Sequence, residues 1–287
     1  MKKKTKLLVL FVLFAIIGTS IIFFMKINRK EGSNNNYASV NEELININEC
    51  TEEFMNNYFE KTKELNEKNN KENRVIVTSK NKMKNVYGAT EVVEAPNNQY
   101  ILQYDSKDEK NKALEELKKD ENIIAEENIV YTFEEYNSWG VEKTGLDYAT
   151  QIANNKQLEK VTVAIVDSGC DMDLFNKSYS GKILETYNEM NSSSSIYDNF
   201  GHGTHIAGTV AESTPDNVSI LPVKVSDSKT IYLDDVVNAI NYITYNKKAD
   251  VINMSFCTYN KVTAEEVAIK AANEANIICV AAAGNDN

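Results

Sequence analysis

Four short, continuous apolar runs in the C-terminal half of the chain constrain its fold more than any other feature. They cover residues 161–166, 220–225, 251–256 and 277–283, and all are rich in branched or small side chains. Such runs fit strands that are buried on both faces, the pattern of a parallel sheet covered on each side. The sequence therefore predicts an α/β fold in which a parallel sheet has flanking helices.

The segments between these runs show helical patterns. Val236, Ile240 and Ile243 recur at the spacing of one helical stripe, and Thr263 with Glu266 has the spacing of a capping box. Strands that alternate with helices are joined by right-handed crossovers in a parallel sheet. Because chemistry in such sheets gathers at the carboxyl ends of the strands, we look for functional residues there.

A smaller α+β unit is expected over residues 74–133. Residues 74–77 and 100–104 read as strands, with a turn at 96–98, and a helix is predicted between 107 and 120 on the spacing of its alanine and leucines. The preceding residues 31–73 are rich in Asn, Glu and Lys. Their one small apolar cluster, near Phe54 and Tyr58, predicts a polar stalk with a single weak helix.

The first 30 residues have the pattern of a signal or transmembrane anchor. Four lysines lie among the first six residues, and residues 7–25 carry no charge, a length that can span a bilayer. A cleaved signal peptide usually has a shorter apolar run and small residues at its exit, so an uncleaved anchor is favoured. We expect the chain to be exported, either membrane-anchored or secreted, with its N-terminus in the cytoplasm.

The charge of the chain excludes one class of partner. The formal net charge is −11 at pH 7, so a protein that tracks nucleic-acid phosphates is not expected. The four cysteines show no CxxC pair and no zinc-binding spacing with histidine. No cofactor is evident from the residues.

Asp167 follows the first apolar run directly, in the segment Val-Ala-Ile-Val-Asp-Ser-Gly. A carboxylate at a strand end can take part in chemistry, but it can equally form a turn or cap a helix. Taken alone, this residue leaves both interpretations open.

The only two histidines of the chain, His202 and His205, stand in the segment Gly-His-Gly-Thr-His-Ile-Ala-Gly. An imidazole at such a turn has what a general base needs when a carboxylate holds its tautomer. The alternatives are a metal-binding pair, whose spacing is not that of an HExxH helix, and a structural histidine, a role that suits His205.

Asn285 comes just after the last apolar run, in Ala-Ala-Ala-Gly-Asn-Asp-Asn. Its amide can donate a hydrogen bond to a developing oxyanion, or it can close a turn.

Taken together and in this order, the three segments resemble the subtilisin family of serine proteases over residues 139–287. The resemblance implies that Asp167 orients the base, that His202 is the base, and that Asn285 donates to the oxyanion. It implies a polypeptide substrate and a serine-type endopeptidase with an Asp-His-Ser triad. Bound calcium is suggested by this resemblance only, and no metal site is assigned because Asp171 and Asp173 do not form a recognisable binding loop.

The resemblance also assigns a substrate-binding strand. Residues 251–255 match the strand that lines the family's cleft, which places Ser255, Phe256 and Cys257 at the substrate. The family usually has a glycine two or three residues after this serine, where the chain has Cys257 and Thr258. The shape of the primary specificity pocket is therefore expected to differ.

The unit at 74–133 resembles the family's inhibitory propeptide, which assists folding and blocks the cleft with its C-terminal tail. Self-cleavage is then expected between residues 131 and 137, just before a mature domain that starts near Trp139. The alternative is a plain α+β spacer.

The family's nucleophile stands in a Gly-Thr-Ser-Met-Ala type of motif, and the chain has no serine after Ser255. Ser255 itself belongs to the cleft strand, so the expectation is a truncated precursor without protease activity of its own. Two other functions stay open: a catalytically dead module that binds peptides or inhibits a protease, and a nonfunctional remnant at the cell surface.

Overall fold

The computed structural model describes residues 50–133 and 146–284, apart from residues 69, 155, 157, 192 and 194. The predicted anchor and the first part of the predicted stalk lie outside the described residues. So do the expected processing region beyond residue 133, Trp139 and Asn285. None of the described helices is long and apolar enough to cross a membrane.

The predicted parallel sheet is confirmed. Its five strands lie in the order β12-β10-β6-β8-β7, and every neighbouring pair is parallel. The strands are β6 (Val161–Asp167), β7 (Tyr187–Asn188), β8 (Val218–Lys224), β10 (Val251–Met254) and β12 (Ile278–Ala281). The four apolar runs correspond to β6, β8, β10 and β12, whereas the two-residue strand β7 was too short to predict.

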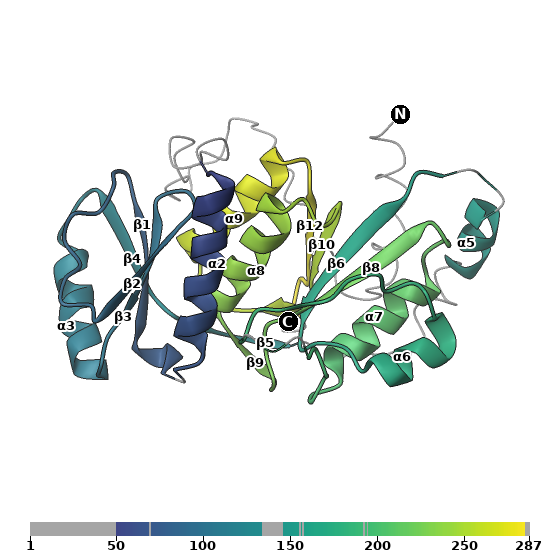
Figure 1. Ribbon diagram of the computed structural model, residues 1–287, viewed down its shortest axis with the longest axis horizontal. Coiled ribbons are helices and arrows are strands. Elements are labelled where there is room, and N and C mark those ends of the chain that lie inside the picture. Colours follow the sequence, from purple (N-terminus) through teal and green to yellow (C-terminus); the bar gives the residue numbers. More distant parts are fainter. Residues whose placement is uncertain are drawn as a thin grey trace.

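Helices cover both faces of this sheet, which explains why its strands are apolar throughout (Figure 1). On β6, Ala164 and Val166 belong to the core shared with α8 (Leu233–Tyr245) and α9 (Thr263–Glu274). Val163 and Ile165 point to the other face, in the core with α6 (Met172–Tyr179) and α7 (His202–Glu212). A further helix, α5 (Leu146–Asn154), precedes β6.

The smaller α+β unit is also present. Its antiparallel sheet has the order β2-β3-β1-β4, formed by β1 (Arg74–Ser79), β2 (Glu91–Ala95), β3 (Gln99–Gln103) and β4 (Ile123–Glu127). The turn predicted at 96–98 joins β2 to β3 through Asn97 and Asn98, both with positive φ. Helix α3 (Lys107–Leu117) covers one face with Leu114 and Leu117.

The single helix predicted near Phe54 and Tyr58 is present, but the described part of residues 31–73 packs against the core and is not a polar stalk. Helix α2 (Glu52–Asn66) spans four turns and is followed by the short helix η3 (Lys71–Asn73). Met55, Tyr58 and Leu65 are buried in the same core as α8. The polar composition misled the prediction because only one narrow stripe of α2 is buried, while charged residues occupy the rest of its surface.

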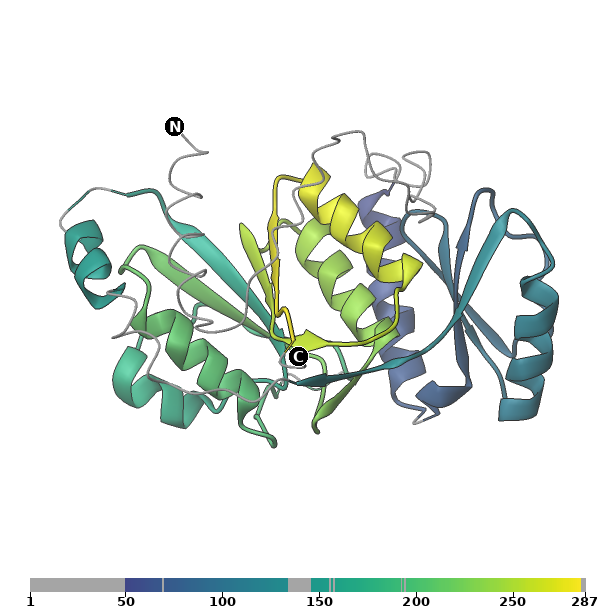
Figure 2. The same cartoon turned by 180° about the vertical axis from the view of Figure 1, so that it is seen from behind.

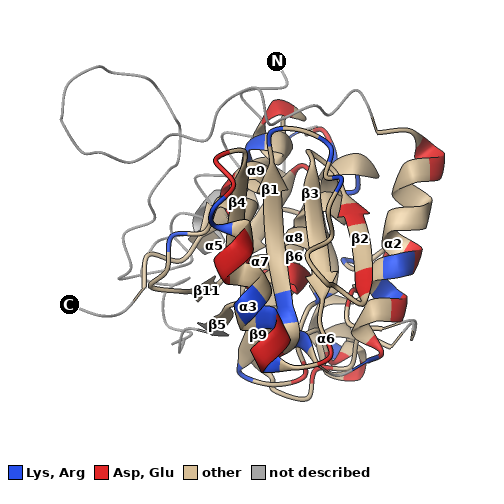
Figure 3. Cartoon of the chain, turned by 90° about the vertical axis from the view of Figure 1, so that its left-hand side faces the viewer, with Lys and Arg blue, Asp and Glu red and all other residues tan. Residues whose placement is uncertain are grey.

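The two units share a layer of helices. Seen from behind in Figure 2, α8 and α9 lie between the antiparallel sheet and the parallel sheet, and α9 contacts β1 and β4. Figure 3 shows acidic and basic residues interspersed over α2 and α3, and acidic residues on β2, on the outer side of the small unit. That side has no continuous basic stripe.

A third sheet connects the two units. Strand β5 (Val130–Phe133), which continues from the small unit, pairs antiparallel with β9 (Thr230–Tyr232) on one side and β11 (Phe256–Cys257) on the other. Both β9 and β11 follow strands of the parallel sheet, β8 and β10. The tail of the small unit is therefore an inner strand between two segments of the large unit.

Candidate active site

Asp167 is the last residue of β6 and its side chain is fully buried. Its Oδ1 accepts a hydrogen bond of 2.8 Å from the backbone nitrogen of Ser168. As predicted, the carboxylate emerges at the carboxyl end of a central strand, where parallel α/β sheets place their functional groups.

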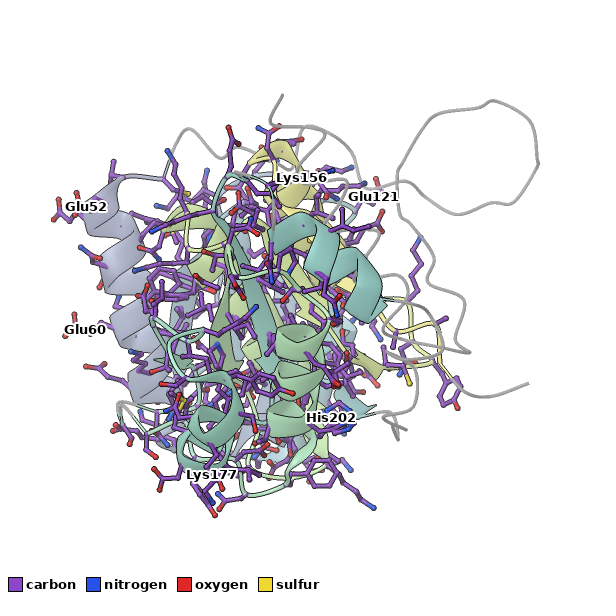
Figure 4. All side chains as sticks on the ribbon, turned by 90° about the vertical axis from the view of Figure 1, so that its right-hand side faces the viewer. Glu52, Glu60, Glu121, Lys156, Lys177 and His202 are labelled. Atoms are coloured by element: carbon purple, nitrogen blue, oxygen red, sulfur yellow. The ribbon has the colours of Figure 1, made fainter. Side chains whose placement is uncertain are left out.

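His202 is the first residue of α7, and its side chain is brought directly to Asp167. The Nδ1 atom lies 2.9 Å from Oδ1 and 3.0 Å from Oδ2 of the carboxylate. Because a carboxylate only accepts, Nδ1 carries the proton in this pair, and Nε2 is left as the basic nitrogen when the ring is neutral. Figure 4 shows His202 at the start of α7.

Asp198 holds the turn that leads into α7, and sequence reasoning missed it. Its carboxylate accepts hydrogen bonds from the backbone nitrogens of Gly201 at 2.7 Å and Thr204 at 2.8 Å, and from the Thr204 hydroxyl at 2.7 Å. The hydroxyl of Ser168 also donates to it, at 2.8 Å. Asp198 thereby joins the helix start to the end of β6, which fixes His202 relative to Asp167. An aspartate three residues before the glycine that precedes a helix was the signal that could have identified it.

Two glycines allow this close approach. A Cβ atom on Gly203 would stand 2.2 Å from the backbone oxygen of Gly169 and 3.1 Å from Oδ1 of Asp167. Gly169 has a φ of +111°, and its Cβ would meet the backbone oxygen of Ile196 at 2.3 Å. The glycines of both motifs are therefore needed to bring the start of α7 against the end of β6.

Burial dominates the electrostatics of the pair. It raises the pKa of Asp167, and the hydrogen bond and charge of His202 oppose that rise. Burial also acts to raise the pKa of Asp198, but hydrogen bonds from Thr204, Gly201 and Ser168 outweigh it and lower the pKa. Asp198 therefore stays an acceptor for the turn across a wide pH range.

His205 does not join the pair. It lies one turn further along α7, where burial and the neighbouring His202 lower its pKa. Within the described residues, no group of three or more histidine, cysteine or acidic side chains is placed to hold a metal ion. Asp171 has another role, because it caps α6 by accepting from the backbone nitrogen of Leu174 at 3.0 Å.

The predicted substrate-binding residues follow β10, the strand next to β6, at the same carboxyl edge of the parallel sheet as Asp167. Ser255 is buried, and its hydroxyl accepts a 2.9 Å hydrogen bond from Asn253. Phe256 and Cys257 form β11 and pair with Phe133 and Thr132 of β5. The strand assigned to the cleft thus has its backbone paired with an extended segment.

The arrangement supplies a base and a place for a peptide. A neutral imidazole whose Nδ1–H is held by a buried carboxylate can take a proton on Nε2 and then stabilise that charge through the carboxylate. The strands β9 and β11 offer backbone groups on two sides of one extended chain. The pair can therefore activate a nucleophile, and β9 and β11 can hold an extended chain.

Comparisons with known proteins agree with the geometry. A family model for the subtilase family matches residues 159–287. Alkaline protease 1 of Aspergillus flavus is 31% identical over 193 residues, which cover 61% of this chain and 46% of that protein. The thermostable alkaline protease of Halalkalibacterium halodurans is 32% identical over 189 residues, with 61% and 49% covered. This chain therefore spans about half the length of these relatives.

The fold has its counterpart among solved structures. Fervidolysin from Fervidobacterium pennivorans, described as a keratinolytic enzyme related to subtilisin, superposes with a TM-score of 0.54 and 17% identity. The match covers 75% of this chain and 40% of fervidolysin. At that identity the likeness shows a subtilisin-like fold. The family model and the two relatives show that residues 159–287 of this chain are similar to the subtilase family.

Proposed function

We propose that this chain belongs to the precursor of a serine-type endopeptidase of the subtilisin type. In this proposal Asp167 orients His202, and Asn285 donates to the oxyanion. A serine, expected in a Gly-Thr-Ser type of motif, completes the triad. The observation that carries the proposal is the 2.9 Å contact between Nδ1 of His202 and the buried carboxylate of Asp167.

The mechanism follows from that contact. Nε2 of His202 removes the proton from the serine hydroxyl as its oxygen attacks the peptide carbonyl, and the imidazolium then gives this proton to the leaving amine. Asp167 stabilises the imidazolium without taking its proton. An amide donor such as Asn285 stabilises the negative charge that develops on the carbonyl oxygen.

The small unit acts in this proposal as an inhibitory propeptide over residues 74–133, with self-cleavage between 131 and 137. The pairing of β5 with both β9 and β11 supports it, because a strand in that place excludes a substrate strand. Contacts of β1 and β4 with α9 hold the unit there.

Export is part of the same proposal, with the chain secreted or anchored through the apolar residues 7–25. The lysines before that run and its length support it. The polypeptide substrate and the membrane are then the partners, together with the chain's own small unit.

The test is to express the chain together with all residues that its reading frame encodes, with His202 intact or changed to Ala. We expect cleavage near residues 131–137 and hydrolysis of peptide substrates only when His202 is present, with a loss on the order of 10⁴-fold or more in kcat on substitution. Equal processing in both proteins would refute the assigned base. An absence of processing and hydrolysis in every product would leave the catalytically dead binding protein as the better function.

A further inference from the structure

Strand β5 shows how the large unit holds an extended peptide. Val130, Tyr131 and Thr132 lie opposite Tyr232, Ile231 and Thr230 of β9, and β11 pairs along the opposite edge. With both edges paired to the backbone, the sequence of the bound segment is read only through its side chains. Of the β5 side chains that the structure describes, Tyr131 is the one that is buried.

The Tyr131 side chain is 2% exposed. Its ring packs edge-on against Phe256, with the ring centroids 5.4 Å apart and the planes at 79°. Ile231, which lies opposite Tyr131 in the register, is fully buried. Strands β9 and β11 therefore each contribute an apolar residue to a pocket for one side chain of the bound strand.

The far end of this pocket is polar. The Tyr131 hydroxyl donates a 2.9 Å hydrogen bond to Oε2 of Glu265, in the first turn of α9. In the part of the chain that the structure describes, no lysine or arginine forms an ion pair with Glu265. Burial raises the pKa of Glu265, and the negative charge of Glu126 adds to that rise.

A partly buried acceptor of this kind discriminates strongly between a side chain that carries a hydroxyl and one that lacks it. Hydrogen bonds to a charged group contribute about twice as much as those between neutral groups, and leaving a buried acceptor without a donor costs free energy. A phenylalanine in the same place would fill the apolar walls but leave Glu265 without its donor. Sites built to bind a hydroxyl reject analogues that lack it far more strongly than apolar pockets reject a size change.

We propose that Glu265 is a specificity-determining residue, which selects a tyrosine in a peptide bound as a strand between β9 and β11. The inference rests on the proposed function, because it assumes that a substrate binds between β9 and β11, where β5 lies. It goes beyond the proposed function by naming the side chain that the large unit prefers.

The test uses the full chain with Tyr131→Ala, so that its own tyrosine does not fill the pocket. Capped peptides with the sequence of residues 129–133, carrying Tyr, Phe or Lys in the third place, are titrated by calorimetry. We expect the Tyr peptide to bind about tenfold tighter than the Phe peptide, equivalent to ~1.4 kcal/mol. Adding Glu265→Leu should abolish that preference.

Glu266→Gln is the matched control, because Glu266 lies in the same turn but pairs with Lys270 at 3.2 Å. It should leave the preference for Tyr unchanged. Equal binding of Tyr and Phe, a preference that survives Glu265→Leu, or tighter binding of the Lys peptide would each overturn the inference.

If no added peptide displaces β5, hydrogen exchange of the β5 backbone tests the inference instead. Tyr131→Phe and Glu265→Leu should each speed exchange of residues 130–133 about tenfold, and the double variant no more than either alone. Additive effects would refute the contact. If the chain binds Tyr peptides selectively but none of the expressed proteins cleaves a peptide, only the endopeptidase proposal is refuted. If Tyr and Phe peptides are cleaved with equal kcat/KM, only this inference is refuted.

Discussion

Glu189 is a buried acid whose charge Lys71 and Lys63 compensate only in part. Its side chain is fully buried, Oε2 accepts a 2.9 Å hydrogen bond from the Tyr187 hydroxyl, and Oε1 has no hydrogen-bond partner. Burial raises its pKa to about 8, and the negative charge of Asp235 contributes to the rise. At neutral pH Glu189 therefore holds its proton in the folded chain.

This raised pKa predicts a pH dependence of stability. The ordinary pKa of 4.5 applies in the unfolded chain, so between about pH 4.5 and pH 8 only the folded chain keeps the proton of Glu189. Its contribution to stability is full below pH 4.5 and is lost as the pH rises toward 8, at ~1.4 kcal/mol per pH unit. Urea unfolding at several pH values measures this slope.

Glu189→Gln is the comparison, because its amide has the shape of the protonated acid and does not titrate. Relative to the unchanged chain, this variant should gain stability steadily from pH 4.5 to 8. Parallel stability curves for the two proteins would show that Glu189 is ionised in the folded state.

At the scale of elements, the start of α9 shows a cap supplied from outside the helix. The carboxylate of Glu126, at the end region of β4, accepts from the backbone nitrogens of Thr263 at 2.6 Å and Ala264 at 2.9 Å. The capping box predicted for Thr263 and Glu266 is therefore wrong, and the N-cap residue Val262 makes no side-chain hydrogen bond. Glu126 of the small unit thus caps the N-terminus of α9, a role that a side chain of the N-cap residue usually has.

Removing this cap should weaken the attachment of the small unit. Glu126→Ala is expected to cost about 1–2 kcal/mol in the free energy of unfolding, because two helix N–H groups lose their acceptor. Glu266→Gln should cost no more than about 0.5 kcal/mol, since its ion pair with Lys270 is near the surface. Thermal and urea unfolding of both variants measure the difference. A larger loss of stability for Glu266→Gln than for Glu126→Ala would favour the local capping box.

These elements show where prediction from sequence succeeds. The runs in β6, β8 and β10 were predictable because both faces of each strand are buried, and Asp167 with His202 stood in motifs that few arrangements of residues satisfy. Asp198 and Glu126 were missed because each acts on backbone groups distant in sequence or across a turn, which leaves no periodic pattern. Helix α2 was underestimated for a related reason, since its stability comes from packing on α8.

At the scale of the whole molecule, a buried ionic contact joins the two units. Arg74 on β1 is fully buried and pairs through Nη1 with Asp234 at the start of α8, which is also fully buried. The same guanidinium donates to Asn66 at 2.7 Å, to the backbone oxygen of Leu65 at 2.6 Å and to Gln103 at 2.9 Å. Burial acts to raise the pKa of Asp234, but the charges of Arg74 and Lys71 outweigh it and lower the pKa.

The last prediction follows from how completely this contact is enclosed. Arg74→Met removes the cation beside a buried carboxylate and leaves the side-chain oxygens of Asn66 and Gln103 without their donor, so the free energy of unfolding should fall by about 3–5 kcal/mol. Adding Asp234→Asn removes the unpaired charge and should recover part of that loss. Lys82→Met is the control in the same unit, since the exposed pair of Lys82 with Glu94 at 3.3 Å should contribute less than about 1 kcal/mol. Urea unfolding of the four proteins gives the answer. Equal costs for Arg74→Met and Lys82→Met would mean that the Arg74–Asp234 pair contributes little to joining the two units, and that the pairing of β5 and the hydrogen bonds of Glu126 are sufficient without it.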